Sequence, residues 1–359
     1  MYPGDAQPEA SQSLLERTAA AFAASVPESP AGDGLFGPGS VTWRLAGGMT
    51  MPVVGLRALL LQALHPLAMA GVDQHSAWRA DPGARLASTS AYEVTIAFGD
   101  RETALAAAAR VRKIHSYVRG TDPATGKPYA AGDPALLLWV HNALTDSQLS
   151  CARLYGSITP DEEDRYVAEQ VAAAELIGIP AGLAPATAKD LAAYFDDVRP
   201  ELLCSPAAAE ATGYLLRYLL RNEPGDTAAG DEPDDGGLWA DVAQAAIASL
   251  PDWAIELYGD VLPKAGAAPD RAEVRAVLGV MDAAFLSEPG VLEARQRIQH
   301  RVRQATRLPG RVTSPADPAQ LASAAASTVT WSLRAGGRLG VAPGIPRIAP
   351  LSSQVTGRR

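Results

Sequence analysis

The chain has 359 residues, with 40 acidic and 31 basic side chains and a formal net charge of −9. Hydrophobic residues make up 47% and charged residues 20%, which is the balance of a globular protein and not of a disordered one. The acidic balance argues against a nucleic-acid partner, because phosphate binding needs clustered Lys and Arg. With only two cysteines, Cys151 and Cys204, the chain cannot build a disulfide framework or a Cys-rich zinc or iron–sulfur site.

The start of the chain is acidic and lacks a basic segment followed by an apolar one, so the sequence predicts no signal peptide. The most apolar stretch covers residues 53–72, but it contains Arg57, Gln62, His65 and Pro66. Burying these polar groups in a bilayer would be costly. We therefore predict a buried helix instead of a membrane span, and a cytoplasmic protein.

Apolar residues, many of them alanine, recur at intervals of three and four, and strictly alternating Val, Ile and Thr runs are nearly absent. This pattern predicts an all-α fold. Thr159 and Glu162 predict a capping box, and Gly120, Gly178 and Gly259 are expected to follow helix ends. The expected helices cover residues 12–24, 52–72, 83–98, 101–119, 133–156, 160–178, 185–198, 207–222, 237–258, 270–285, 289–306 and 317–334.

Three segments differ from the helical regions in composition. Residues 1–35 are rich in Pro, Gly and Ser and are predicted to form an N-terminal arm around one short helix. Residues 222–237 are acidic, rich in Gly and Pro and poor in large apolar side chains, which indicates a surface loop. We predict a single large helical domain over residues 36–310. A C-terminal helix and an extended tail are expected over residues 311–359.

The most informative text for chemistry is RVRKIHSYVRG, residues 110–120. His115 has Arg112 three residues before it and Arg119 four residues after it, which would place all three on one face of a helix. Two cations beside a histidine lower its pKa, and neutral imidazole is a good metal ligand. The arginines could also pair with carboxylates of a ligand. The alternative is a solvated basic face with an incidental histidine.

A second candidate is the helix that is expected to begin after Asp81, which is placed to cap it. Arg85 and Thr89 are four residues apart and share a face, with Ser88 and Tyr92 next to them. A donor-only guanidinium beside a hydroxyl suits binding of an oxygen species or a carboxylate. The alternative is a solvent-facing arginine in the first helical turn.

The other four histidines have plainer alternatives. His65 precedes Pro66 inside an apolar helix, where the proline is expected to produce a kink that can open a cavity. A hydrogen-bonded core histidine is the alternative there. His141 is more simply a buried histidine bonded within the bundle, His75 lies just past the apolar helix, and His300 lies in an Arg-rich, surface-exposed helix.

Sequence motifs of several other enzyme classes are missing. The chain has no HExxH of a zinc protease and no GxSxG nucleophile elbow. It also has no Walker loop, no GxGxxG after a strand and no pair of Glu-x-x-His helices for a di-iron site.

The order of four segments resembles a family of haem-containing oxygenases. The family includes the latex-clearing rubber oxygenases and the MpaB-like fungal oxygenase of mycophenolic acid biosynthesis, and many bacterial members are known only as a domain of unknown function. The matching segments are HPLAMAGVDQHS (residues 65–76), DPGARLASTSAYEVTIAFG (81–99), RVRKIHSYVRG (110–120) and PYAAGDPALLLWVHNALTDS (128–147).

The resemblance implies a mostly helical fold with a globin-like core that holds a b-type haem. It places the proximal iron ligand at His115. It places the arginine and threonine of the distal side at Arg85 and Thr89, which we predict to be catalytic. The other residues predicted to contact the cofactor are Arg112, Arg119, His65 and Ser88.

Two positions depart from the rubber oxygenases. Their distal lysine is replaced here by Ser88, and their distal glutamate corresponds to an apolar position near Met69. Asp73 is the nearest acidic residue, and His75 is close to it. Polyisoprene cleavage is therefore not implied.

Three functions are open on the sequence. The favoured one is a haem b-dependent oxidoreductase that uses O2 or peroxide on an apolar or aromatic small molecule, with or without a redox partner. Its pocket would be shaped by the apolar helix around residues 59–69. The alternatives are a haem-binding sensor or carrier without turnover, and a helical scaffold without a cofactor. The scaffold gives no reason for Arg112, His115 and Arg119 to share a face.

Overall fold

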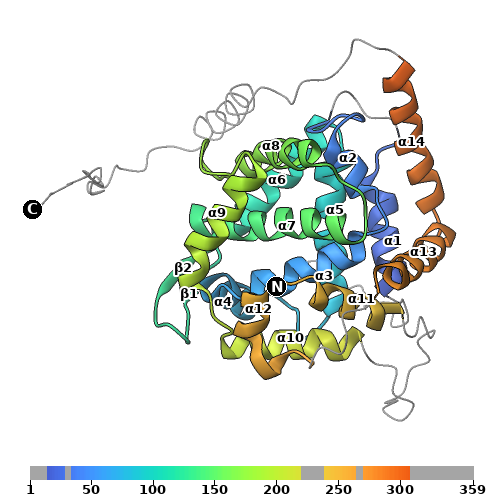
Figure 1. The fold of residues 1–359 in the computed structure, drawn as a ribbon. Coiled ribbons are helices and arrows are strands. Elements are labelled where there is room, and N and C mark those ends of the chain that lie inside the picture. Colours follow the sequence, from blue (N-terminus) through green and yellow to red (C-terminus); the bar gives the residue numbers. More distant parts are fainter. Residues whose placement is uncertain (1–13, 29–33, 220–237, 264–269, 308–359) are drawn as a thin grey trace, which may run out of the picture. The chain divides into compact units, whose positions relative to one another are not determined.

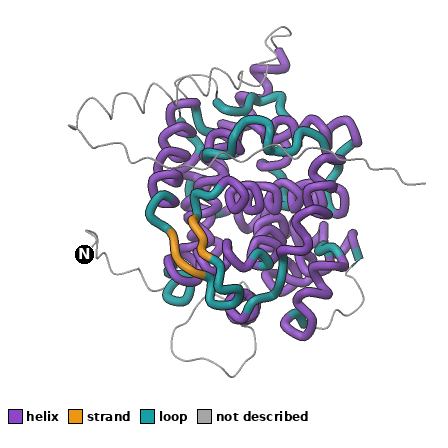
Figure 2. The backbone as a smooth tube through the Cα atoms, turned by 90° about the vertical axis from the view of Figure 1, so that its left-hand side faces the viewer, coloured by secondary structure: helices purple, strands orange, loops and turns teal. Residues whose placement is uncertain are grey.

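The computed structural model describes residues 14–28, 34–219, 238–263 and 270–307, and this part of the chain is almost entirely helical (Figure 1). The fold is all-α, as predicted. Two strands, β1 (Arg119–Thr121) and β2 (Pro128–Ala130), form one antiparallel hairpin (Figure 2). Two short 3-10 turns cover Arg199–Glu201 and Gly259–Val261.

The helices in chain order are α1 (Leu14–Ser25), α2 (Val41–Ala46), α3 (Met51–Ala63), α4 (Pro66–His75), α5 (Pro82–Phe98), α6 (Arg101–His115), α7 (Pro134–Leu154), α8 (Pro160–Ile177), α9 (Ala188–Val198), α10 (Pro206–Leu219), α11 (Leu238–Ala248), α12 (Asp252–Tyr258), α13 (Arg271–Ser287) and α14 (Val291–Arg307).

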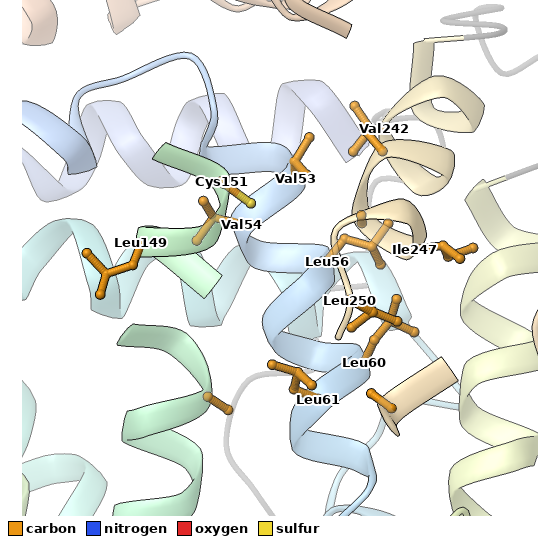
Figure 3. Close-up of a cluster of buried hydrophobic side chains, with 14 of the residues drawn as sticks. Val53, Val54, Leu56, Leu60, Leu61, Leu149, Cys151, Val242, Ile247 and Leu250 are labelled. Atoms are coloured by element: carbon orange, nitrogen blue, oxygen red, sulfur yellow. The ribbon is translucent and has the colours of Figure 1, made fainter. Parts of the chain in front are cut away.

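Helix α3 lies at the centre of the main hydrophobic core, between α7 and α11 (Figure 3). Its apolar residues point in several directions because the helix is covered on more than one side. Removing such side chains from water contributes about 1.5–3 kcal/mol each. The labelled core residues are Val53, Val54, Leu56, Leu60 and Leu61 from α3, Leu149 and Cys151 from α7, and Val242, Ile247 and Leu250 from α11 and the turn after it.

One charged side chain lies inside this core. The guanidinium of Arg57 pairs with Asp146 at 2.8 Å and donates hydrogen bonds to the Ser147 hydroxyl at 2.8 Å and the Ser249 carbonyl at 3.0 Å. These partners compensate for the hydration that the guanidinium loses on burial.

The apolar stretch of residues 53–72 is interrupted at the position where the sequence predicts a kink. Helix α3 ends at Ala63, α4 begins at Pro66, and the two axes are bent by 104°. His65 has extended backbone angles, as expected for a residue before proline, and Pro66 cannot donate a backbone hydrogen bond. Among the described helices, none is by itself long and apolar enough to cross a membrane, although α3 and α4 together meet that criterion as a bent pair.

The predicted substrate pocket around residues 59–69 stays a prediction. Leu60, Leu61, Leu64 and Met69 are buried. Helix α3 is covered by α7 and α11, and Met69 lies beyond the bend on α4.

The predicted helix 101–119 is too long. Helix α6 ends at His115, and the chain turns into the β1–β2 hairpin (Figure 2). The carboxylate of Asp122 accepts hydrogen bonds from the Ala124 and Thr125 backbone, and this closes the hairpin loop. Gly120 therefore lies within β1 and does not end a helix.

Other boundaries are closer to expectation. Thr159 and Glu162 form the predicted capping box, and Gly178 ends α8 at φ 106°, where a side chain would be strained. The predicted helix 237–258 is divided, because Pro251 stands between α11 and α12. Helix α2 was not expected from the sequence.

The helices around the candidate site form a chain of contacts. Helix α5 packs against α1 and α6, α6 packs against α8, and α8 packs against α7. The predicted surface loop at residues 222–237, the predicted helix 317–334 and the tail lie outside the described residues. The domain boundaries at residues 36 and 310 stay predictions.

Candidate active site

Helix α5 carries the first two predicted site residues, and its start is fixed by Asp81. The Asp81 carboxylate accepts a hydrogen bond from the Ala84 backbone N–H at 2.8 Å, and it pairs with Arg17 of α1 at 2.8 Å. This cap places Arg85 one turn into the helix and Thr89 one turn further on.

Arg85 and Thr89 are bonded to each other. The Arg85 guanidinium donates to the Thr89 hydroxyl at 2.6 Å, and that hydroxyl donates to the Arg85 carbonyl at 3.0 Å. Desolvation lowers the pKa of Arg85, although its side chain keeps a large accessible surface. Arg85 therefore packs among protein atoms and still keeps part of its surface open.

His115 is the last residue of α6. Its pKa is lowered first by desolvation and then by the positive charge of Arg85, so the ring is neutral at pH 7. The electrostatic effect shows that the fold brings Arg85 and His115 together from different helices. The Nδ1 atom of His115 is fully buried and has no hydrogen-bond partner among the described residues.

The two arginines near His115 differ in position. Arg112 lies one turn before His115 on α6, and its guanidinium donates to the carbonyl of Leu176 at the end of α8. Arg119 does not share that helical face, because α6 has already ended and Arg119 belongs to β1. Its guanidinium is exposed and donates to the Ser116 carbonyl at 2.6 Å. The predicted stripe of three residues on one helix is therefore wrong for Arg119.

The structure adds Glu93 and Tyr166 to the predicted residues and places them near Tyr92. Glu93 and Tyr92 lie on α5, one turn beyond Thr89 and Ser88, and Tyr166 faces them from α8. The charge of Glu93 raises the pKa of both tyrosines after desolvation, which is the larger cause. Desolvation alone raises the pKa of Glu93 to about 7. The sequence signal was available, since Glu93 follows Thr89 by four residues.

His141 of α7 is also desolvated, which lowers its pKa to about 4. It lies one turn from Leu137, and Leu137 and Arg112 both border Gly178. The expected hydrogen bond of its ring within the bundle is absent from the described part of the chain. His141 is therefore neutral at pH 7, and it lies one turn along α7 from Leu137, which packs against the end of α8.

Two residues predicted to contact the cofactor, His65 and Ser88, make no described interaction with Arg85 or His115. His65 is buried against Trp139 at 5.9 Å between ring centroids, and its Nε2 atom is 4.0 Å from a carboxylate oxygen of Glu201. No described interaction joins it to Arg85 or His115. Ser88 is exposed on α5 beside Thr89 and has no hydrogen-bond partner among the described residues.

The described residues contain no group of three or more His, Cys, Asp or Glu that is arranged to hold a bare metal ion. An open surface hollow lies elsewhere, between α2 and α8, and includes none of the residues above. Its lining includes Pro38, Arg44, Glu162, Arg165 and Val302.

The sequence matches a family described as "ER-bound oxygenase mpaB/B'/Rubber oxygenase, catalytic domain" over residues 43–283. The chain belongs to this family. No curated protein and no solved structure matches the sequence of the chain. The match to the mpaB/rubber oxygenase family begins in α2 and ends in α13, so it includes every residue of the site described above.

Membership in the mpaB/rubber oxygenase family decides between the open functions at the level of enzyme class. The family model describes a catalytic domain of oxygenases, so the chain is an oxygenase. The scaffold and the non-catalytic sensor or carrier are thereby disfavoured.

Proposed function

We propose that the chain is a haem b-dependent oxygenase in which His115 binds the iron, and that it acts on an apolar or aromatic small molecule with O2 or peroxide. The observation that supports this most directly is that the charge of Arg85 on α5, which is bonded to Thr89, lowers the pKa of His115 at the end of α6. A redox partner is part of the proposal if O2 is the oxidant.

The chemistry of His115 fits a ligand of haem iron. Its ring is neutral and desolvated, and a neutral imidazole nitrogen is a common haem ligand. Its Nε2 atom is not among the fully buried unpartnered atoms, whereas Nδ1 is. Coordination through Nε2 would give the ring a partner that the protein itself does not supply. The N–H at Nδ1 would then be free to donate to a hydrogen-bond acceptor in the haem-bound protein, and that bond would fix the orientation of the ring.

The arginines fit the carboxylates of a haem unequally. Arg119 is exposed and engages one backbone carbonyl, so it can pair with a propionate without losing a buried contact. Arg112 is engaged by the Leu176 carbonyl and would have to exchange that partner.

Arg85 and Thr89 give the site its donors. An arginine carries five N–H donors, and Arg85 uses one of them for Thr89. The remaining donors would hold an oxygen atom of O2, peroxide or substrate and stabilise negative charge that develops on it. The haem would supply the oxidation chemistry, and these residues would orient the reactants.

Neither Ser88 nor Asp73 takes the place of the distal lysine or glutamate of the rubber oxygenases. Ser88 carries no group that could replace a distal lysine, and Asp73 is paired with Arg79 at 2.6 Å. Asp73 is therefore not free to act as a base. We accordingly propose a small molecule and not polyisoprene as the substrate.

The proposal is tested by the absorption spectrum of the purified protein, with pyridine haemochrome quantification and carbon monoxide binding after reduction. We expect close to one b-type haem per chain in the wild type and haem loss in His115→Ala. His300→Ala is the matched control, since His300 is exposed on α14. Full haem content in His115→Ala would contradict the assignment of the ligand.

Turnover separates an oxygenase from a haem carrier. We expect the haem-loaded wild type to consume hydrogen peroxide, or O2 with a reductant, faster than free haem does. A haem-loaded protein without turnover under either condition would favour the carrier.

A further inference from the structure

Glu93 is an acidic residue for which the packing of the fold gives no structural reason. The described residues offer its carboxyl group no hydrogen bond and no ion pair. Buried carboxyl groups are ordinarily paired or hydrogen-bonded, because an unpaired buried charge is costly. An apolar side chain at this position would pack without that cost, so a structural role does not explain the residue.

The surrounding protein desolvates Glu93, but its oxygens are not sealed. Glu93 is partly accessible, and its oxygens are not among the fully buried unpartnered atoms. The same holds for the hydroxyl of Tyr166, which no described residue bonds. These polar atoms therefore keep some accessible surface, as Arg85 does.

The helix geometry connects Glu93 to the proposed catalytic residues. Arg85, Thr89 and Glu93 follow one another at intervals of four on α5, so they form one stripe along the helix. The hydrogen bond between Arg85 and Thr89 fixes the first turn of the stripe, and Glu93 occupies the next.

Charged groups near α5 do not neutralise Glu93. Arg112 of α6 lowers the pKa of Tyr92, but it is bound to the Leu176 carbonyl and does not act on Glu93, whose pKa is raised by desolvation alone. The basic residues of the other helices packed on α5 are engaged elsewhere. Arg17 of α1 pairs with Asp81, and Arg44 of α2 pairs with Glu162.

We propose that Glu93 is the general acid–base group of this oxygenase site, which holds one proton at rest and exchanges it with a reacting oxygen atom beside Arg85 and Thr89. This rests on the proposed function. In its acid form Glu93 gives its proton to an oxygen atom that gains negative charge, and the resulting carboxylate takes one proton back from water. Glu93 moves no electrons. A group that titrates near neutral pH is suited to both directions of transfer.

The first experiment detects the proton directly and needs no haem. Infrared difference spectra between about pH 5 and pH 9 are recorded for the apo protein. We expect the wild type to show the C=O stretch of a protonated carboxyl group that titrates around pH 7, and Glu93→Gln to lack it. Glu256→Gln, an exposed position on α12, is the matched control and should keep the band. A titrating band that persists in Glu93→Gln would overturn the proposal.

The second experiment measures the pH profile of hydrogen peroxide consumption by haem-loaded protein. We expect Glu93→Gln to keep the haem content of the wild type, to lose the break near pH 7 and to slow by about 10²-fold or more, the range of general acid–base effects. Glu93→Asp should keep the infrared band and recover part of the rate. An unchanged rate and profile in Glu93→Gln would overturn the catalytic role.

The two proposals fail in different ways. A wild type that binds no haem overturns the proposed function, and the infrared spectra still decide whether Glu93 holds the proton. A haem-loaded wild type whose profile Glu93→Gln leaves unchanged overturns only the role of Glu93.

Discussion

The Arg85 guanidinium and the Thr89 hydroxyl form a closed pair, since Thr89 accepts from the side chain of Arg85 at 2.6 Å and donates to its carbonyl at 3.0 Å. The hydroxyl thereby links the charged end of Arg85 to its own backbone one turn away. The direction of the guanidinium is then set by the helix and not by rotamer choice along a flexible stem.

This pair predicts the effect of Thr89→Val, which keeps the shape of the side chain and removes the hydroxyl. We expect normal haem content and a rate of peroxide consumption reduced by roughly 10²-fold, the scale for losing one preorganised donor. Thr89→Ser should restore most of the rate. A Thr89→Val enzyme that works at the wild-type rate would show that Arg85 needs no such support.

Glu169 is expected to stabilise the fold and to take no part in the reaction. Its buried carboxylate accepts from the backbone N–H groups of Val41 at 3.1 Å and Thr42 at 2.8 Å, and from the Thr42 hydroxyl at 2.8 Å. These bonds hold the start of α2 on α8. We expect Glu169→Ala to lower the free energy of unfolding by about 2–4 kcal/mol, because hydrogen bonds to a charged group are the stronger ones.

Urea denaturation measures this effect, and Glu175→Gln on the same helix is the control. The control should unfold within about 0.5 kcal/mol of the wild type, the usual range for substitutions away from such contacts. Equal stability of Glu169→Ala and the wild type would contradict the anchoring of α2.

His141 predicts a loss of stability in acid. Its ring takes up a proton at a pKa near 6.5 when the chain is unfolded and at about 4 in the folded protein. The unfolded state therefore binds more protons between these values, and the free energy of unfolding falls as the pH is lowered through this window. The contribution is on the order of 3 kcal/mol. Unfolding of apo His141→Gln by urea should show a smaller loss between pH 6.5 and pH 4.

His65 also lowers the free energy of unfolding as the pH falls, because desolvation lowers its pKa too. The effect of His141 is therefore read as a difference from the wild type, with exposed His300→Gln as the control. An acid dependence that is identical in His141→Gln and the wild type would contradict the prediction.

For Glu93 we expect the opposite dependence of the free energy of unfolding on pH. Its carboxyl group ionises near pH 4.5 when unfolded and near 7 when folded, so the folded state keeps the proton longer. The free energy of unfolding then falls as the pH rises from 4.5 to 7 and levels off above. Apo Glu93→Gln should exceed the wild type in stability above pH 7 by up to roughly 3 kcal/mol, and by little at pH 4.5. Equal stabilities at pH 8 would refute this.

The sequence predicts most helices of the fold because their signals are local. Asp81, Thr159 and Gly178 mark helix ends through their own hydrogen bonds or backbone angles, and the structure confirms each of them. Pro66 marks the break between α3 and α4 in the same way. The end of α6 at His115 had no such mark. Residues 116–119 could continue a helix, and the hairpin that replaces it depends on the pairing of β1 with β2.

The site was predictable where spacing along one helix decides the contact, as for Arg85 and Thr89. It was not predictable where packing decides. The meeting of Arg85 with His115 requires the contact of α5 with α6, and the sequence suggested it only through the family resemblance. Glu93 was overlooked because its desolvation depends on how the helices pack, which its position on α5 does not reveal.

The hydrogen bond from Arg112 to the Leu176 carbonyl makes the last turn of α8 a competitor for the same guanidinium. An acidic group that takes this same N–H of Arg112 leaves the Leu176 carbonyl without its donor, whereas one that binds the other guanidinium N–H groups does not. In the first case binding of that group and order at the last turn of α8 oppose each other thermodynamically, and each can be measured through the other.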